Sequence, residues 1–336
     1  MEIQALIRSL PKAELHLHIE GTLEPELKFE LAGRNSLELP YADAEAMRAA
    51  YDSDDRPSFQ EQSYEGMSVL LVEEDFYDLA MANFERVAVQ GVVYVELFFD
   101  PQAHTTRGIA FDTVMSGPRR AQRDAEARLG IRSGLIMCFL RDMPAESAAE
   151  TLKSAEPYRD VIVGVGLDSD EQGNPPVKFR EVFADAREQG YHLTMHCDVD
   201  QQDSLEHIRQ CLHEIGVERI DHGSNVFESD ELTDEIVRRG LGLTSCPISN
   251  SYVSDGTKAS EIRALLERGV LVTVNSDDPA YFPGYVADNL ETLQAEAELS
   301  REQVIELVRN AFAISWLPEA ERAAYLDRLD AWVAAN

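Results

Sequence analysis

The sequence predicts a single (β/α)₈ barrel with extra helices over its mouth and a helical C-terminus. Three observations support this prediction. Eight short apolar segments alternate with helical patterns, which is typical of parallel strands joined by helices. Polar residues gather at the C-terminal ends of those segments, where barrel enzymes place their active sites. No repeat or low-complexity linker divides the 336 residues, so we assign 1–336 to one domain.

The eight predicted strands are rich in Val, Ile, Leu and Tyr, and many end in Gly, Asp, Asn or Pro. They cover residues 13–20, 91–99, 132–140, 161–168, 191–198, 219–226, 241–248 and 270–278. Amphipathic helical patterns lie between most of them, for example at 179–190, 204–216 and 259–269. The stretch 21–90 reads mostly as helices and is predicted to form a lid over the barrel mouth. Its aromatic residues are predicted to pack in helical cores rather than to stack on a ligand: Phe59, Tyr64, Phe76 and Tyr77.

The chain is strongly acidic, with 62 acidic residues against 30 basic ones and a formal charge of −32. A phosphate backbone or an anionic membrane would repel such a surface, so we expect neither nucleic acid nor a membrane as partner. The N-terminus shows no signal-peptide pattern, and the longest apolar stretch, GVVYVELFF, is too short to cross a bilayer. The four cysteines form no CxxC pair. These features predict a cytoplasmic protein with free thiols, and they leave a homo-oligomer open.

Histidine and aspartate residues at the strand ends indicate a metal site. His16 and His18 are spaced by two on the first predicted strand and therefore point to the same face. His196 and Asp277 end the fifth and eighth strands, and His222 lies on the sixth. Three imidazoles and a carboxylate suit Zn²⁺. A pair of satisfied or surface histidines is the alternative for His16 and His18, but the joint pattern favours a catalytic zinc with His16, His18, His196 and Asp277 as ligands.

The motifs also identify a family. PKAELHLHIEGTLEPE, VVYVELFFDPQ, GVGLDSDEQGNPP, RIDHGSNV, TSCPISN and NSDDPAYF resemble the adenosine/adenine deaminases of the amidohydrolase superfamily over nearly the whole chain. The resemblance implies a (β/α)₈ barrel with one zinc on the four ligands above. It implies that His222 orients the attacking water and helps to deprotonate it, and that Asp278 hydrogen-bonds the purine N7. The fourth strand carries no Lys for a carbamylated metal bridge, so a mononuclear site is expected.

The segment GVGLDSDEQGNPPVKF resembles the adenine-type branch of the family, which acts on a free base. In that branch the loop after the fourth strand closes the pocket around N3 and N9 of the purine. Glu171 is the candidate for such a contact here. The alternative is that Glu171 is a solvated carboxylate in a surface loop.

One residue departs from the family pattern. The family has His-x-x-Glu after the fifth strand, and this Glu protonates the purine N1, but Val199 occupies its position here. Two carboxylates flank the gap. If the extended conformation continues past His196, Asp198 and Asp200 point inward and Val199 points away. We favour Asp200 as the replacement acid, with Asp198 second. The alternative is that both are loop carboxylates and that catalysis is slow.

The predicted function is zinc-dependent hydrolytic deamination at C6 of adenine or of an N6-substituted adenine, which gives hypoxanthine and ammonia or an amine. A reshaped acid loop beside the leaving amine is the reason to consider the N6 substituent. The alternatives are an adenosine deaminase, a mononuclear amidohydrolase acting on another C–N bond, and a purine-binding protein with weak or lost catalysis. Cys197, next to a ligand, is expected to pack in the core.

Overall fold

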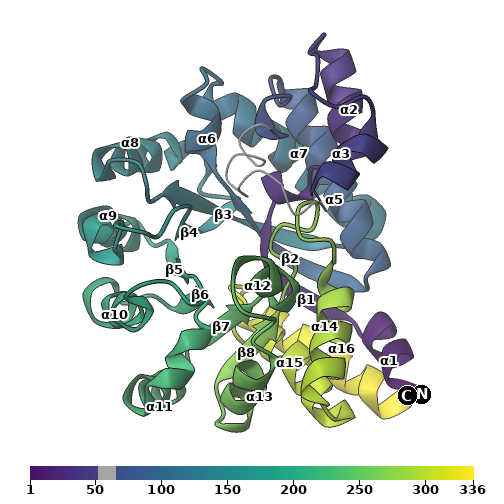
Figure 1. Ribbon diagram of the computed structural model, residues 1–336, viewed down its shortest axis with the longest axis vertical. Coiled ribbons are helices and arrows are strands. Elements are labelled where there is room, and N and C mark those ends of the chain that lie inside the picture. The colour runs from purple at the N-terminus through teal and green to yellow at the C-terminus, as the bar shows by residue number, and fades with distance from the viewer. Residues whose placement is uncertain (52–65) are drawn as a thin grey trace.

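Eight parallel strands form the centre of the protein in the computed structural model, which describes residues 1–51 and 66–336. The strands pair in chain order from β1 to β8, and helices surround them (Figure 1). The strands are β1 (Lys12–His18), β2 (Val92–Phe99), β3 (Arg132–Leu140), β4 (Ile162–Asp168), β5 (His192–Cys197), β6 (Arg219–His222), β7 (Gly242–Ser245) and β8 (Leu271–Val274). The prediction of a (β/α)₈ barrel is confirmed.

The barrel closes where β1 meets the segment that follows β8. Leu17 pairs with Asp277 in an isolated parallel bridge. The His18 N–H donates to the Asp277 carbonyl oxygen at 3.0 Å, and the Asp277 N–H donates to the His16 carbonyl oxygen at 3.1 Å. These backbone hydrogen bonds align the segment beyond β8 with the end of β1. They therefore bring Asp277 beside the two histidines of β1, although about 260 residues separate them in the chain.

The strands are buried on both faces, as expected for a parallel sheet covered by helices. Every residue of β1 is buried, including Glu14, His16 and His18 on the interior face and Leu15 and Leu17 on the alternate face. The leucines join the main apolar core between strands and helices. The interior face of β1 is thus polar at positions where a barrel normally places branched apolar residues.

Helices lie around the strands and across the barrel mouth (Figure 1). They are α1 (Ile3–Ser9), α2 (Pro25–Arg34), α3 (Ala44–Tyr51), α5 (Glu73–Val89), α6 (Pro101–Thr105), α7 (Phe111–Leu129), α8 (Ala145–Ser154), α9 (Arg180–Glu188), α10 (Ser204–Gln210), α11 (Asp230–Arg239), α12 (Pro247–Val253), α13 (Ala259–Glu267), α14 (Val286–Ala297), α15 (Arg301–Ala313) and α16 (Glu319–Ala335). None of the helices in the described ranges is long and apolar enough to cross a bilayer.

The stretch 21–90 contains helices α2, α3 and α5, with residues 52–65 outside the described part of the chain. Met47 and Tyr51 of α3 pack with Tyr281 and Phe282, which follow β8 at the barrel mouth. Helix α5 instead packs against α7 in the outer layer. Of the aromatic residues considered above, Phe76 is buried in the core and Tyr77 hydrogen-bonds Asp124 of α7. Phe59 and Tyr64 lie outside the described residues.

Candidate active site

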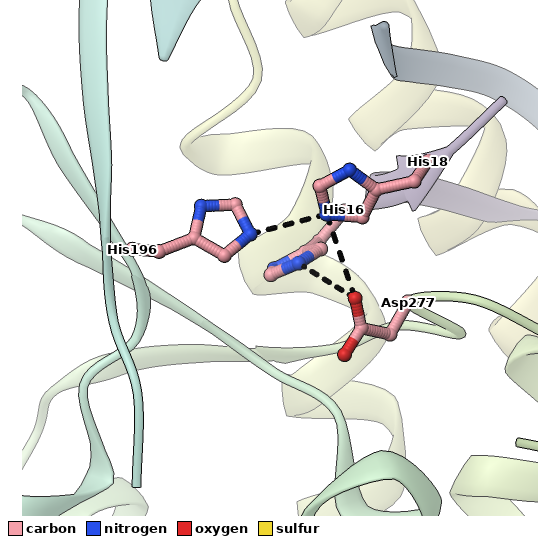
Figure 2. Close-up of side chains that lie close together, drawn as sticks. All are labelled: His16, His18, His196 and Asp277. Atoms are coloured by element: carbon pink, nitrogen blue, oxygen red, sulfur yellow. Dashed lines mark hydrogen bonds and ion pairs between the residues drawn. The ribbon is translucent and has the colours of Figure 1, made fainter. Parts of the chain in front are cut away.

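Four predicted ligands meet at the C-terminal end of the barrel. Three imidazoles and one carboxylate, from His16, His18, His196 and Asp277, offer atoms that all lie within 4.8 Å of one another. The Nε2 atoms of His18 and His196 are 3.1 Å apart. Asp277 Oδ1 is 3.2 Å from His16 Nε2 and 3.5 Å from His18 Nε2. Figure 2 shows that the four side chains, from β1, β5 and the end of β8, converge on one point.

The outer nitrogen of each histidine faces an oxygen atom, which leaves Nε2 for the centre. His16 Nδ1 is 2.9 Å from Thr244 Oγ1. The Nδ1 atoms of His196 and His18 lie 3.4 Å from Asp221 Oδ2 and 3.5 Å from Asp168 Oδ2. Such partners fix the tautomer that presents Nε2 to a metal. His16 Nε2 is buried and has no hydrogen-bond partner among the described residues.

The charges of three of the four residues, His18, His196 and Asp277, also fit a metal ion, whereas Asp277 raises the pKa of His16 against the effect of its burial. Burial lowers the pKa of His18 to about 3 and lowers that of His196 well below its usual value. Burial opposes ionisation of Asp277, but the adjacent His16 holds the pKa of this carboxyl well below its usual value. Neutral imidazole and ionised carboxylate are the forms that bind metals. Three nitrogens and one oxygen are a donor set that Zn²⁺ accepts, so the residues present fit the expected ion.

His222 stands beside this group in a strained conformation. Its φ is +57°, in the left-handed region that non-glycine residues rarely adopt. Its Nε2 lies 3.7 Å from Asp277 Oδ2 and 3.8 Å from Asp198 Oδ1. Burial lowers the pKa of the imidazole, so it is neutral and able to accept a proton. Strain held by the surrounding structure is common at active sites.

The carboxylates after β5 do not follow the predicted extended path, and that expectation is wrong. Strand β5 ends at Cys197, and Asp198 and Val199 both line the cavity above the ligands. Asp200 has a φ of +56° and pairs with Lys258 at 2.5 Å. Its carboxylate is absent from the described lining of the cavity. Of the two candidate acids, the structure therefore brings only Asp198 to the site, against the preference for Asp200.

Asp198 has the protonation state that a proton donor needs. Burial raises the pKa of its carboxyl to about 8, and the negative charge of Glu171 acts in the same direction. At neutral pH the group therefore carries a proton. Its position 3.8 Å from His222 places an acid and a base on the same side of the cavity. Such a pair can remove a proton from water and deliver one to a substrate.

Glu171 is buried, so the alternative of a solvated loop carboxylate is wrong. Its Oε2 accepts the Asp198 N–H at 2.9 Å and lies 3.3 Å from Arg141 Nη1. Its Oε1 lies 2.5 Å from His207 Nδ1. Glu171 lines the cavity, but three protein groups already engage its oxygens. In this structure Glu171 fixes the backbone position of Asp198. A contact between Glu171 and the substrate stays a prediction.

Asp278 lies at the cavity wall on the β8 side. Burial, together with the adjacent Asp277, raises the pKa of its carboxyl well above the usual value, which favours the neutral form that can donate a hydrogen bond. Gly21, just after β1, permits this position: a Cβ on residue 21 would lie 1.9 Å from Asp278 Oδ1. The expected donor to a purine N7 is therefore present in the cavity.

Comparisons with known proteins agree with the motifs. The model of the adenosine deaminase family matches residues 11–332. An adenine deaminase from Zymomonas mobilis is 49% identical over 97% of both chains, and an uncharacterized deaminase from Schizosaccharomyces pombe is 47% identical over 99% of both. The crystal structure of an adenine deaminase from Arthrobacter aurescens is 42% identical with a TM-score of 0.92, over 97% of this chain and 100% of that one. The chain belongs to the adenosine deaminase family.

As a member of this family, the protein is a hydrolytic deaminase that acts on a C–N bond. Its cavity of about 350 Å³ is within the range of small-molecule sites. Cys197 points away from it: its Sγ is buried 3.5 Å from Cys211 Sγ, as expected for a strand neighbour of an inward ligand. The Cys197 thiol therefore packs in the core of this deaminase.

Several residues of the deaminase cavity were not predicted from the sequence. Asp100 and Asp168 line it at the ends of β2 and β4, and Glu20 lines it just after β1. Each is a carboxylate at a strand end, the same signal that identified Asp277. Arg141, buried after β3 and bonded to the His196 carbonyl oxygen, gave no such signal. A single arginine in a loop is ordinary in sequence, and only the fold shows that it is buried.

Proposed function

We propose that this deaminase hydrolyses the C6–N bond of a free purine base, adenine or an N6-substituted adenine, with one Zn²⁺ as cofactor. The observation that carries the proposal is the meeting of a metal-ligand group, the neutral base His222 and the neutral acid Asp198 in one cavity. Three relatives that are 45% to 49% identical are named adenine deaminases. With adenine and water, the products are hypoxanthine and ammonia.

His16, His18, His196 and Asp277 would hold the ion. When bound, Zn²⁺ supplies a Lewis acid that lowers the pKa of water to about 7. Asp277 has a second task, because its Oδ2 faces His222 Nε2 at 3.7 Å. This carboxylate holds the imidazole toward the reacting water and stabilises it once it has taken a proton.

The proton transfers follow from the positions of the side chains. His222 accepts a proton as water attacks C6, because its imidazole is neutral and faces the metal group. Asp198 donates its proton to N1 of the ring, which prevents negative charge from building up there. As the C6–N bond breaks, the proton taken up by His222 passes to the leaving amine, and the remaining hydroxyl proton at C6 returns to Asp198, which leaves a carbonyl group at C6. Asp278 donates a hydrogen bond to N7 and fixes the orientation of the base. Val199 contributes no proton, so Asp198 takes over the task of the missing family Glu.

The cavity wall near the leaving group favours an N6 substituent as well as a bare amine. Val199 after β5, Val253 on α12 and Phe282 after β8 give the cavity lining apolar side chains that such a substituent could contact. Ser249 and Val253 are four residues apart on α12 and share one face of this helix. Val253 is 47% exposed, and an apolar substituent on N6 would cover it. An alkylamine would then leave in place of ammonia.

The test is a deamination panel on metal-replete protein, with adenine, adenosine, N6-methyladenine, N6-isopentenyladenine and a non-purine amine. We expect turnover of free bases and little turnover of adenosine. Faster turnover of adenosine than of any base would support the nucleoside alternative. No turnover of any purine by protein that holds zinc would refute the proposal and leave a binding protein.

A further inference from the structure

A group of carboxylates lines the cavity on the side away from His222. Glu20 and Asp100 follow β1 and β2, and Asp168 is the last residue of β4. Asp168 faces His18 Nδ1 at 3.5 Å, so it supports a metal ligand. Glu20 Oε1 accepts the Asp100 N–H at 3.2 Å and lies 3.0 Å from His104 Nε2. The reaction as derived above uses neither Glu20 nor Asp100.

One oxygen of each of these two side chains has no hydrogen-bond partner among residues 1–51 and 66–336. Glu20 Oε2 and Asp100 Oδ1 are buried without a hydrogen-bond partner in the described part of the protein. Glu20 is 3% exposed, and both residues line the cavity. An unpaired buried acceptor costs free energy, so such atoms call for a donor that arrives with the ligand.

The order of strands shows which part of a purine would reach them. In the orientation proposed above, C6 would lie between His222 at the end of β6, Asp198 after β5 and the metal group, and N7 would lie at Asp278 after β8. Strands β1 and β2 lie across the barrel from β5 and β6 (Figure 1). The five-membered ring runs from N7 through C8 to N9, so it extends from the β8 side toward β1 and β2. N9 therefore falls beside Glu20 and Asp100.

We propose that the Glu20–Asp100 pair accepts the N9–H of the base and thereby selects free purines over purines substituted at N9. This inference rests on the proposed function, since it uses the orientation given there. A nucleoside has no N9–H and would leave Glu20 Oε2 and Asp100 Oδ1 without a donor beside Met67, which also lines the cavity. Sites built to bond an N–H reject analogues that lack it by up to about 10⁴–10⁵-fold. Glu171, whose oxygens are engaged by Asp198, Arg141 and His207, is not needed for this contact.

The experiment compares adenine with 9-methyladenine, which differ only at the atom in question. Both are tested as substrates and as ligands by calorimetry in wild type, Asp100→Asn and Asp100→Ser. Asp100 is the residue before α6, and Asn and Ser are both favoured there, so the helix should form in each variant. Asp142→Asn is the matched control, because Asp142 is an exposed carboxylate near Asp100 that does not line the cavity.

We expect Asp100→Ser to weaken the binding of adenine on the order of 10- to 100-fold, mostly as an increase in KM. The binding of 9-methyladenine should stay unchanged or become tighter. Asp100→Asn should show a smaller loss of the same selectivity, and Asp142→Asn should show none. An equal loss for both ligands, or an unchanged ratio, would overturn the inference. If wild type bound adenine but turned over no purine, the proposed function would fail, and the binding ratio would still decide the role of Asp100.

Discussion

At the scale of single residues, the site differs at Val199 from the His-x-x-Glu pattern that its motifs resemble, and we propose that Asp198, one position earlier, takes the place of the missing acid. Val199 lines the cavity but cannot donate a proton. Asp198 reaches the same cavity because its backbone N–H is held by Glu171 at 2.9 Å. The Asp side chain is one methylene shorter than Glu, and Asp198 lies one residue before the position of the family Glu. The carboxyl of Asp198 would therefore approach the purine ring from a different direction. Asp200 is turned away and is paired with Lys258.

These contacts predict opposite outcomes for two adjacent substitutions. Asp198→Asn removes the proton donor and should lower kcat for adenine about 10²–10⁴-fold, the usual contribution of general acid catalysis. Asp200→Asn removes an ion pair with Lys258 outside the cavity and should change kcat less than tenfold. Steady-state kinetics with zinc content measured for each variant would check this. A larger loss in Asp200→Asn than in Asp198→Asn would restore Asp200 as the acid.

The pH dependence of kcat/KM should show the titration of the Asp198 carboxyl. Asp198 donates only when protonated, and burial raises its pKa to about 8. The active form is therefore present below this pH and is lost as the pH rises through it. We expect kcat/KM for adenine to fall above about pH 8 in wild type. The Asp198→Asn variant should lack this fall while it keeps the acid limb that belongs to His222. A fall of the same midpoint in the variant would assign the limb to another group.

At the scale of elements, the sequence located every strand but placed several ends too late. The sixth and eighth strands were predicted at 219–226 and 270–278, whereas β6 ends at His222 and β8 at Val274. The reason lies in the backbone: His222 and Asp277 have φ values of +57° and +66°. The pattern of apolar residues predicts which part of a strand is buried. It does not predict where a residue adopts a left-handed backbone conformation and directs its side chain toward the barrel mouth. The metal ligands were predictable because they are strand residues or adjoin strands. Asp198 was misjudged because it lies in the turn.

The short 3₁₀ segment after β1, Glu20–Thr22, offers a prediction at this scale. Gly21→Ala would place a Cβ 1.9 Å from Asp278 Oδ1 and must displace that side chain. We expect kcat/KM for adenine to fall about 10²-fold, since a shift of about 1 Å can have that effect, while zinc content stays unchanged. Gly33→Ala is the control, because a Cβ on residue 33 meets no atom within 4 Å. Wild-type kinetics in Gly21→Ala would show that Asp278 does not need its present position.

At the scale of the whole molecule, one ion would join parts of the chain that are far apart in sequence. Its ligands come from β1, β5 and the segment after β8, and the pairing of Leu17 with Asp277 closes the barrel at the same place. Without a cation, three buried imidazoles face one another, and His16 Nε2 has no hydrogen-bond partner among the described residues. The folded barrel should therefore depend on the metal for stability as well as for chemistry, since a ligand that binds only the folded state stabilises it.

Metal removal should accordingly lower the unfolding temperature. At a free metal concentration of about 100 times Kd, the stabilisation is about 2.7 kcal/mol, which corresponds to a shift on the order of 4 °C for a chain of 336 residues. Differential scanning calorimetry before and after chelation, and again after Zn²⁺ is restored, would measure it. His16→Ala should unfold at the lower temperature and be insensitive to the chelator. His213→Ala, which removes an exposed histidine paired with Glu235, should respond to chelation as wild type does. An unchanged unfolding temperature in protein shown to be metal-free would mean that hydrogen bonds such as that between the His18 N–H and the Asp277 carbonyl oxygen close the barrel unaided.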